Sequence, residues 1–237
     1  MIRQLIKSQR RQILIDINTQ RDLFLADGNA CIRNHRRVLA HVRRMMAWAR
    51  YRNVPIISTC EVYPNNNNNG GNAINYCIDG TKGQKKIPYT LLSDRASFPA
   101  DNNTDLPADI LRQHRQIVLH KRCCDPFDEP RIERLLSEIR ASEFILIGAC
   151  AEGAVSAMAL GLLQRGKKVT IVTDAVGVHN KSKSKLALRK AEAKGARLVE
   201  TKKIAGTSHL RRVGICDCRS CNGQSQKEPA ENKIEQQ

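Results

Sequence analysis

The chain has 237 residues, 41% of them hydrophobic, which is enough for one domain with a sizeable core. Its formal net charge of +17 favours anionic partners, such as nucleic acid, an acidic protein or an anionic metabolite. No stretch approaches the roughly 18 consecutive apolar residues of a membrane span, and the basic segment 1–11 lacks the apolar centre of a secretory signal. We therefore expect a cytoplasmic protein without a membrane partner.

The chain contains nine cysteines, and 4% of its residues are aromatic. An odd cysteine count without a signal argues against a secreted disulfide framework, so we expect most of the thiols to be reduced. Few aromatic side chains are available to stack on the bases of single-stranded nucleic acid.

The first half of the chain predicts two strands, one helix and a long irregular stretch. QILID (12–16) and VPIIST (54–59) are apolar almost throughout, which is typical of buried strands. Residues 33–52 carry apolar side chains at helical spacing. Residues 60–115 lack such a pattern, and their polar run NNNNNGGN (65–72) cannot bury apolar surface.

The second half alternates strands with helices. Strands are predicted at 117–120, 144–149, 168–175 and 196–201. Helices are predicted at 130–140, from the turn after Ala149 to about Gln164, and at 182–194. Apolar strands separated by helices predict a Rossmann-like, three-layer α/β/α domain with a mostly parallel six-stranded sheet.

Residues with reactive side chains fall at the ends of the predicted strands. In open α/β sheets, ligands bind outside the carboxyl ends of the strands. This rule places Asp16, residues 59–61, Lys121 and the turn GACAEGAV (148–155) along one rim of the sheet.

Four segments at these strand ends carry family motifs. They are ILIDINTQRDLFLADG (13–28), DGTKGQKKIP (79–88), LHKRCCDPF (119–127) and GACAEGAVSAMALGLLQRGKKVTIVTDAVG (148–177). Their order and spacing resemble those of the isochorismatase-like cysteine hydrolases, the superfamily that includes nicotinamidases. The resemblance implies the isochorismatase-like hydrolase fold over residues 12–203, followed by a cysteine-containing extension at 204–237.

The same resemblance implies which residues occupy the catalytic positions. Asp16 matches the aspartate that accepts the proton of the nucleophile, and Lys121 matches the catalytic lysine. The family's nucleophilic cysteine corresponds to Ala154. The resemblance also implies a non-proline cis peptide between Cys150 and Ala151, and oxyanion-binding backbone amides at Ala151 and Ala154.

A methyl group at position 154 cannot attack a carbonyl carbon. The sequence therefore predicts a catalytically impaired member, a pseudoenzyme, that binds a small carbonyl or carboxylate ligand. An active hydrolase of a small amide, ester or vinyl ether is the alternative, with water activated by Asp16 or a displaced nucleophile such as Cys150 or Ser156. By resemblance, we expect a homo-oligomer.

Two possible metal sites differ in their ligands. The nicotinamidase-type site needs an Asp-x-His pair after the second strand, where this chain has Glu61 and Tyr63, so we do not expect that site. Cys216, Cys218 and Cys221 form a Cys-x-Cys-x-x-Cys run. Three thiolates at this spacing would hold a structural zinc if a fourth ligand joined them; otherwise they are reduced thiols in the extension.

Seven arginines and no acidic residue lie between Arg33 and Arg52. Arg36, Arg43 and Arg50 recur at every seventh residue and so share one helix face. A solvated outer face is the simplest interpretation. The third functional alternative is a basic scaffold that binds nucleic acid or an acidic partner through this face.

Overall fold

The computed structural model describes residues 12–65, 74–101, 103–139, 141 and 143–206. The basic segment 1–11, nearly all of the polar run at 65–72 and most of the extension at 204–237 lie outside these residues. The predicted zinc ligands Cys216, Cys218 and Cys221 therefore also lie outside the described chain.

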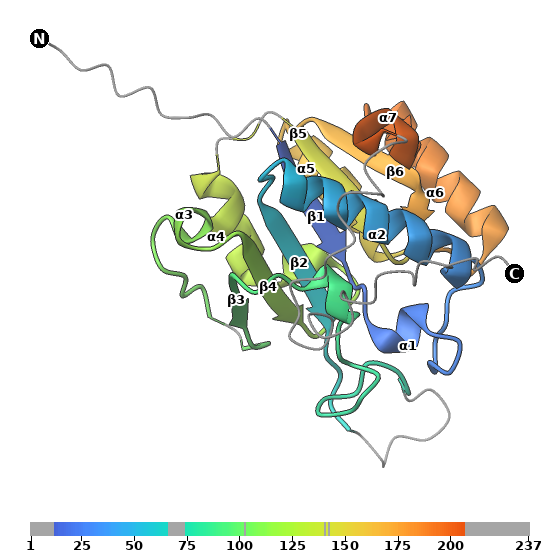
Figure 1. Ribbon diagram of the computed structural model, residues 1–237, viewed down its shortest axis with the longest axis horizontal. Helices are drawn as coiled ribbons and strands as arrows, with labels where there is room; N and C mark the ends of the chain where they lie inside the picture. Colours follow the sequence, from blue (N-terminus) through green and yellow to red (C-terminus); the bar gives the residue numbers. More distant parts are fainter. Residues whose placement is uncertain (1–11, 66–73, 102, 140, 142, 207–237) are drawn as a thin grey trace, which may run out of the picture.

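A parallel sheet forms the centre of the domain (Figure 1). Within the described residues it has seven strands in the order β3-β4-β2-β1-β5-β6-β7, and every neighbouring pair is parallel. The strands are β1 (Gln12–Ile17), β2 (Ile56–Glu61), β3 (Arg95–Phe98), β4 (Gln116–Lys121), β5 (Glu143–Gly148), β6 (Val169–Val176) and β7 (Arg197–Val199). The predicted α/β fold is confirmed, with seven strands rather than six.

Helices cover both faces of the sheet. On one face lie α1 (Arg21–Phe24), α2 (His35–Tyr51) and α7 (Thr201–Ala205). On the other face lie α3 (Ile110–Gln113), α4 (Pro130–Glu138), α5 (Ala154–Gln164) and α6 (Lys181–Ala193). Two apolar clusters, one on each face, bury the strand side chains that alternate between these layers. None of the described helices is long and apolar enough to cross a membrane.

Local sequence explains where the predicted boundaries were wrong. The strand predicted to reach residue 201 ends at Val199, because Thr201 begins α7 and donates its backbone N–H and hydroxyl to Asp174 Oδ1, at 2.8 and 2.7 Å. The missed strand β3 has only four residues at the sheet edge, with alternating exposed and half-buried side chains. Its apolar pattern is too short to stand out within the irregular stretch.

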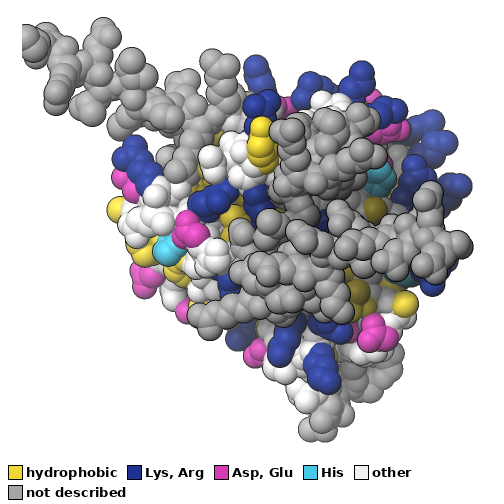
Figure 2. Space-filling model, viewed as in Figure 1, with side chains coloured by type: hydrophobic (Ala, Val, Ile, Leu, Met, Phe, Trp, Pro, Cys, Tyr) yellow, Lys and Arg dark blue, Asp and Glu magenta, His cyan; other side chains and the backbone are white. Residues whose placement is uncertain are grey.

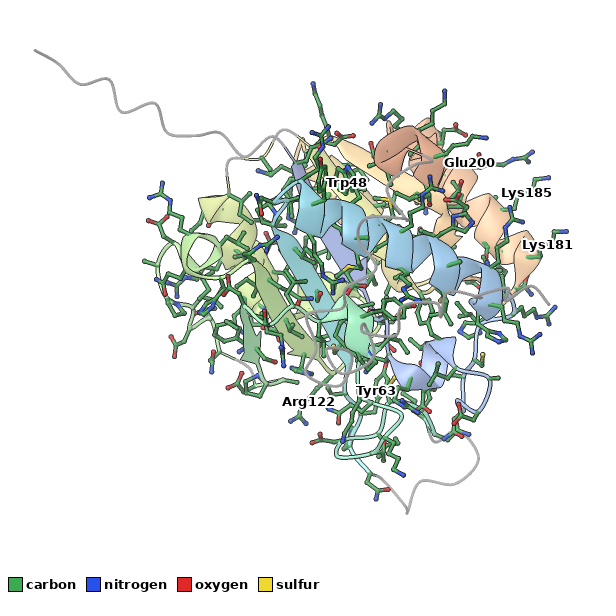
Figure 3. All side chains as sticks on the ribbon, in the orientation of Figure 1. Trp48, Tyr63, Arg122, Lys181, Lys185 and Glu200 are labelled. Atoms are coloured by element: carbon green, nitrogen blue, oxygen red, sulfur yellow. The ribbon has the colours of Figure 1, made fainter. Side chains whose placement is uncertain are left out.

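The strand order places a topological switch point at β1. The chain runs from β1 to β2 and β4 on one side, then returns to β5 on the other. The carboxyl ends of β1, β2, β4 and β5 therefore meet at one rim, where ligand sites of open α/β sheets form. Tyr63 and Arg122, which follow β2 and β4, mark this rim at the lower edge of the sheet in Figure 3.

Candidate functional site

A buried polar cluster lies at the ends of β1, β2 and β4. Lys121 Nζ and Asn18 Nδ2 both donate to Glu61 Oε1, at 3.1 and 2.7 Å, and we call these three residues the rim cluster. Glu61 and Lys121 are the last residues of adjacent strands and are register partners, so parallel pairing brings their side chains together. All three residues are buried, and a buried ion pair persists only when further hydrogen bonds satisfy it.

Backbone and amide groups hold the rim cluster rigidly. Gln20 makes two hydrogen bonds to the Glu61 backbone, accepting from its N–H at 2.8 Å and donating to its carbonyl at 2.7 Å. Asn18 adopts a φ of 50° and accepts a hydrogen bond from the Thr59 hydroxyl at 2.9 Å. Lys121 Nζ also donates to the carbonyl oxygens of Cys123 and Cys124. A left-handed asparagine with both ends of its side chain bonded is a strained, fixed position, as is common at functional sites.

Asp16 does not belong to the rim cluster, and its ion-pair partner is Lys86 rather than Lys121. Its Oδ2 lies 2.9 Å from Lys86 Nζ and also accepts from Thr19 and Ser58 hydroxyls at 3.1 and 3.0 Å. Strand alternation is the reason: Asp16 lies on the same face as Leu14, which packs under α2.

Lys121 and position 154 lie on the opposite side of the sheet from Asp16. Lys121 is two residues after Leu119, which shares its apolar cluster with Ala154. The carboxylate that meets Lys121 is therefore Glu61, and the side chain at the end of β1 that reaches this pair is Asn18.

The turn between β5 and α5 carries a cis peptide, one residue before the predicted position. The cis bond joins Ala149 to Cys150, not Cys150 to Ala151. The Ala149 N–H is fixed by a hydrogen bond to the Ile17 carbonyl at 2.8 Å. At Gly148, where φ is 114°, an added Cβ would lie 1.9 Å from that same carbonyl oxygen, so only glycine fits.

One of the two predicted backbone amides, that of Ala151, also differs from the prediction by one residue. The Ala151 N–H donates to the Gly177 carbonyl at 2.8 Å and is therefore not free to bind an oxyanion. The amides of Cys150 and Ala154 instead contact thiol sulfurs, those of Cys150 itself and of Cys124. These two amides, rather than those of Ala151 and Ala154, are the donors that the turn presents at the N-terminus of α5.

Two thiols flank the position that Ala154 occupies. The Ala154 side chain is 1% exposed, so its methyl group belongs to the core. Cys124 is exposed and Cys150 is half-buried. A Cβ added to Gly153 would lie 3.1 Å from both sulfurs, so the two thiols lie close to the residue that precedes Ala154.

The electrostatics of the site keep these thiols protonated. Burial, followed by the charges of Glu152, Cys124 and Glu61, raises the pKa of Cys150 to about 12. Burial and the Glu61 charge raise the pKa of Cys124, against the opposing effects of Lys121 and the Ala154 amide. A protonated thiol is a poor nucleophile, so neither sulfur is activated at neutral pH.

Tyr63 and Tyr76 lie beside Glu61 at the rim. Their rings meet edge to face with centroids 5.5 Å apart. Burial and the Glu61 charge raise the pKa of Tyr76 to about 12 and that of Tyr63 further. Both phenols therefore stay neutral, and a tyrosine oxygen in this state is a weak ligand for a metal ion. The described residues contain no group of three or more His, Cys, Asp and Glu side chains that could hold one.

The arginines of α2 are divided between structure and solvent. Arg50 donates to the Tyr89 carbonyl at 2.6 Å, and Arg43 lies over the Tyr89 ring at 5.8 Å. Arg36 and Arg37 are exposed. Of the three arginines predicted to share one helix face, Arg43 and Arg50 therefore contact Tyr89, in the segment after Ile87, and Arg36 is exposed to solvent.

Sequence reasoning placed Glu61 at the rim but did not pair it with Lys121, and it missed Asn18 and Cys124 as site residues. Glu61 and Lys121 could have been paired from their positions at the ends of strands adjacent in the sheet. Cys124 lies three residues beyond Lys121, and the local sequence contains no signal that its sulfur meets the Ala154 amide.

Comparison with known proteins identifies the family. The isochorismatase domain model matches residues 12–203, whereas no curated protein sequence matches significantly. Among solved structures, the pyrazinamidase of Pyrococcus horikoshii is 21% identical with a TM-score of 0.61, covering 80% of this chain and 99% of its own.

Two further solved structures share the fold. A nicotinamidase/pyrazinamidase from Bacillus subtilis is 16% identical with a TM-score of 0.64, covering 80% of this chain and 100% of its own. A ribonuclease from Caenorhabditis elegans is 19% identical with a TM-score of 0.56, and the match covers 86% of this chain and 85% of the ribonuclease chain. At these identities the similarity to each structure establishes the fold only. From the domain match over residues 12–203, the chain belongs to the isochorismatase family.

Proposed function

We propose that this isochorismatase-family protein binds a small carbonyl or carboxylate ligand at the rim cluster without hydrolysing it through a thiol at position 154. The observation that carries the proposal is the buried methyl group of Ala154. It stands in the first turn of α5, where the family resemblance implies the attacking cysteine. A methyl group can neither attack a carbonyl carbon nor exchange a proton.

The partner groups of a covalent mechanism are also rearranged. Asp16, the acid implied by the resemblance, pairs with Lys86 beneath α2. At the rim its place beside Lys121 is taken by Glu61, and Glu61 Oε1 is occupied by Lys121 and Asn18. A carboxylate held by two donors is a weaker proton acceptor than a free one, because hydrogen bonding stabilises its charged form.

The groups that would bind a ligand oxygen remain. The amides of Cys150 and Ala154 lie at the N-terminus of α5, where the helix dipole favours negative charge. Lys121 and Asn18 already donate to Glu61, and Lys121 also donates to the carbonyls of Cys123 and Cys124, so the two amides are the donors that face a ligand. These donors suit a polarised carbonyl or a carboxylate.

Nicotinamide and nicotinate are suitable probes, since a nicotinamidase shares the fold. Isothermal titration of the full chain should detect binding of at least one probe, and incubation with nicotinamide should release no ammonia above a protein-free control. Cys124→Phe should block access to the Ala154 amide and weaken binding at least tenfold. Cys123→Phe, at the adjacent position, is the matched control and should have little effect.

Ammonia release by the wild-type chain, or equal loss of binding in both phenylalanine variants, would contradict this proposal. The two variants change the same side-chain volume on the same loop. Only position 124 has its sulfur against the Ala154 amide.

A second candidate function is supported by Cys124. If the protein is an active hydrolase with a displaced nucleophile, this thiol is positioned to serve, since it already accepts a hydrogen bond from the Ala154 amide. Its sulfur would attack the carbonyl carbon while the thiol proton passes to the departing amine or alcohol, and water would then hydrolyse the thioester to release the carboxylic acid and restore the thiol. Amide or ester turnover that disappears in Cys124→Ser but survives in Cys150→Ser would favour this candidate over the first.

A third candidate, binding of nucleic acid, rests on charge. Figure 2 shows Lys and Arg side chains along the edge of the molecule where α6 lies, and the net charge is +17. A ribonuclease with the same fold shows that this scaffold is compatible with a nucleic-acid substrate. Binding that weakens steeply with salt and with Arg36→Gln and Arg37→Gln would support it, and indifference to both would exclude it.

A further inference from the structure

A large cavity lies on the face of the sheet opposite Ala154, away from the rim cluster. It has a volume of about 770 Å³, and the residues that matter for its chemistry are Cys60, Lys85, Lys86, Arg95, Val118 and His120. We call it the β3–β4 cavity. Small-molecule sites are typically about 300–1,000 Å³, so this volume suits one drug-sized ligand.

The floor of the cavity consists of two cross-strand pairs. Cys60 on β2 is the register partner of His120 on β4, and Val118 on β4 is the register partner of Ser97 on β3. Strand alternation directs all four side chains to the face that carries α2. None of the described α-helices covers this half of that face, because α2 packs mainly on β5 and β6.

The wall of the cavity is the segment from residue 84 to 93, which contains the 3-10 turn η1 (Pro88–Thr90). Gln116 ties this segment to β4, accepting from the Leu92 N–H at 2.7 Å and donating to the Thr90 carbonyl at 2.8 Å. Arg50 fastens the same segment to α2. The cavity is therefore bounded by fixed backbone on one side and by strands on the other.

The charge of the cavity is positive and uncompensated. Lys86 is neutralised by Asp16, but Lys85 and Arg95 form no ion pair with any described residue, and no acidic side chain is among the described residues that line the cavity. Arg95 Nη1 donates to the Leu92 carbonyl at 2.5 Å, which fixes the guanidinium against the wall. A fixed guanidinium and a nearby ammonium suit a phosphate or a carboxylate.

The floor adds polar groups but no negative charge. Burial, with the Asp16 and Glu61 charges opposing Lys86 and Lys121, raises the pKa of Cys60 to about 11, so its thiol stays protonated. His120 Nδ1 lies 2.8 Å from the Phe98 carbonyl, which can only accept, so this nitrogen carries the proton and Nε2 is the acceptor. Burial lowers the pKa of His120 and keeps the ring neutral.

We infer that the β3–β4 cavity is a second ligand site, for a small organic anion that joins a phosphate or carboxylate group to an apolar body. Lys85 and Arg95 bind the anionic group, and Val118 and the leucines of the wall contact the apolar part. No residue of the rim cluster or of the turn at 148–155 lines this cavity, so its test is independent of the proposed rim function.

Isothermal titration of the full chain at low ionic strength tests this inference with four probes. Phenyl phosphate and benzoate carry an anionic group and a ring, inorganic phosphate lacks the ring, and benzyl alcohol lacks the charge. We expect phenyl phosphate or benzoate to bind at least tenfold more tightly than inorganic phosphate and benzyl alcohol. Whichever of phenyl phosphate and benzoate binds more tightly shows whether the site prefers a phosphate or a carboxylate.

Two double variants show where the probe binds. Lys85→Gln with Arg95→Gln should weaken binding at least tenfold, and both side chains are exposed, so the fold should persist. Lys181→Gln with Lys185→Gln removes the same charge from α6, where both lysines point outward (Figure 3), and should change affinity less than twofold. Equal loss in both double variants, inorganic phosphate binding as tightly as the ring compounds, or no binding of any probe would overturn the inference.

Discussion

Two buried lysine–carboxylate pairs lie within one sheet, on opposite faces. Asp16 and Lys86, beneath the segment after Gln84, are closed in by two hydroxyl groups and the core under α2. Glu61 and Lys121 lie at the carboxyl ends of the strands, beside backbone amides and two thiols. Their chemistry is similar, but their neighbours differ, because Lys86 lines the β3–β4 cavity whereas Glu61 and Lys121 lie near the turn that begins α5. Position along a strand therefore decides which of the two sites each pair adjoins.

The largest effect that separates the two pairs should be a loss of stability without a loss of ligand affinity. Asp16→Asn leaves the Lys86 ammonium buried without a counter-charge, and we expect it to cost about 3–5 kcal/mol of unfolding free energy. Because Asp16 bonds to Lys86, Thr19 and Ser58 and to no residue of the rim cluster, nicotinamide affinity should stay within twofold in the fraction that remains folded. Denaturant unfolding and calorimetric titration of the same samples measure both quantities. A large loss of affinity at unchanged stability would put Asp16 back into the rim site.

Restoring the covalent groups at the rim sharpens the comparison. Ala154→Cys alone should produce no turnover, because the carboxylate beside Lys121 is already held by two donors. Adding Asn18→Asp places a second carboxylate against Glu61, and two adjacent carboxyl groups raise the pKa of one of them. We expect the double variant to release ammonia from nicotinamide at least tenfold faster than either single variant.

Asp16 provides the control for this gain in ammonia release, because it keeps a carboxylate on the face of the sheet that carries α2. If Ala154→Cys hydrolyses nicotinamide alone, and adding Asp16→Asn abolishes this activity, then Asp16 serves the rim. That result would reverse the assignment of the two pairs.

The reactivity of Cys124 and Cys150 should respond to the Glu61–Lys121 pair and not to the Asp16–Lys86 pair. Glu61 raises the pKa of both Cys124 and Cys150, so Glu61→Gln should lower both pKa values. Alkylation by iodoacetamide at pH 7 should then accelerate about 3- to 10-fold at both sulfurs, as the thiolate fraction rises. Glu152→Gln is the matched control. It should accelerate the alkylation of Cys150 only, because the Glu152 charge raises the pKa of Cys150 and is not among the charges that shift the pKa of Cys124. Peptide mapping by mass spectrometry distinguishes the sites.

The smallest expected effect concerns the junction between the rim turn and α6. Burial would raise the pKa of Glu152, but hydrogen bonds from Ser184 and the amides of His179 and Asn180 lower it below 4.5. A depressed carboxyl pKa adds stability above the unfolded value, which is lost as pH falls through the folded value. Glu152→Gln should therefore flatten the stability profile below about pH 5, by about 1 kcal/mol or less. An unchanged acid profile would show that these hydrogen bonds are not formed.

Much of the fold could be predicted because long apolar strands and amphipathic helices have strong periodic signals. The central strands, α2, α5 and α6 were found from this periodicity, and Lys121 was correctly placed at the end of a strand. The short edge strand β3 was missed because four half-exposed residues carry almost no periodic signal.

The site was harder to predict, since single-residue shifts matter there. Asp16 and Asn18 are two residues apart, but strand alternation points Asp16 under α2, and the left-handed backbone of Asn18 turns its side chain to Glu61. The cis peptide and one of the two free amides were predicted one residue too late, whereas the amide of Ala154 was predicted at its own position. Such details depend on tertiary hydrogen bonds, which the local sequence does not specify.

The most direct test is an ¹⁵N NMR titration of the full chain with nicotinamide, followed by intact-protein mass spectrometry. We expect the largest amide shifts at Cys124, Cys150 and Ala154, small shifts at Asp16 and Lys86, and no covalent adduct. Shifts centred on Asp16 and Lys86, or an acyl adduct on any thiol, would contradict the proposal that the rim binds its ligand without covalent chemistry.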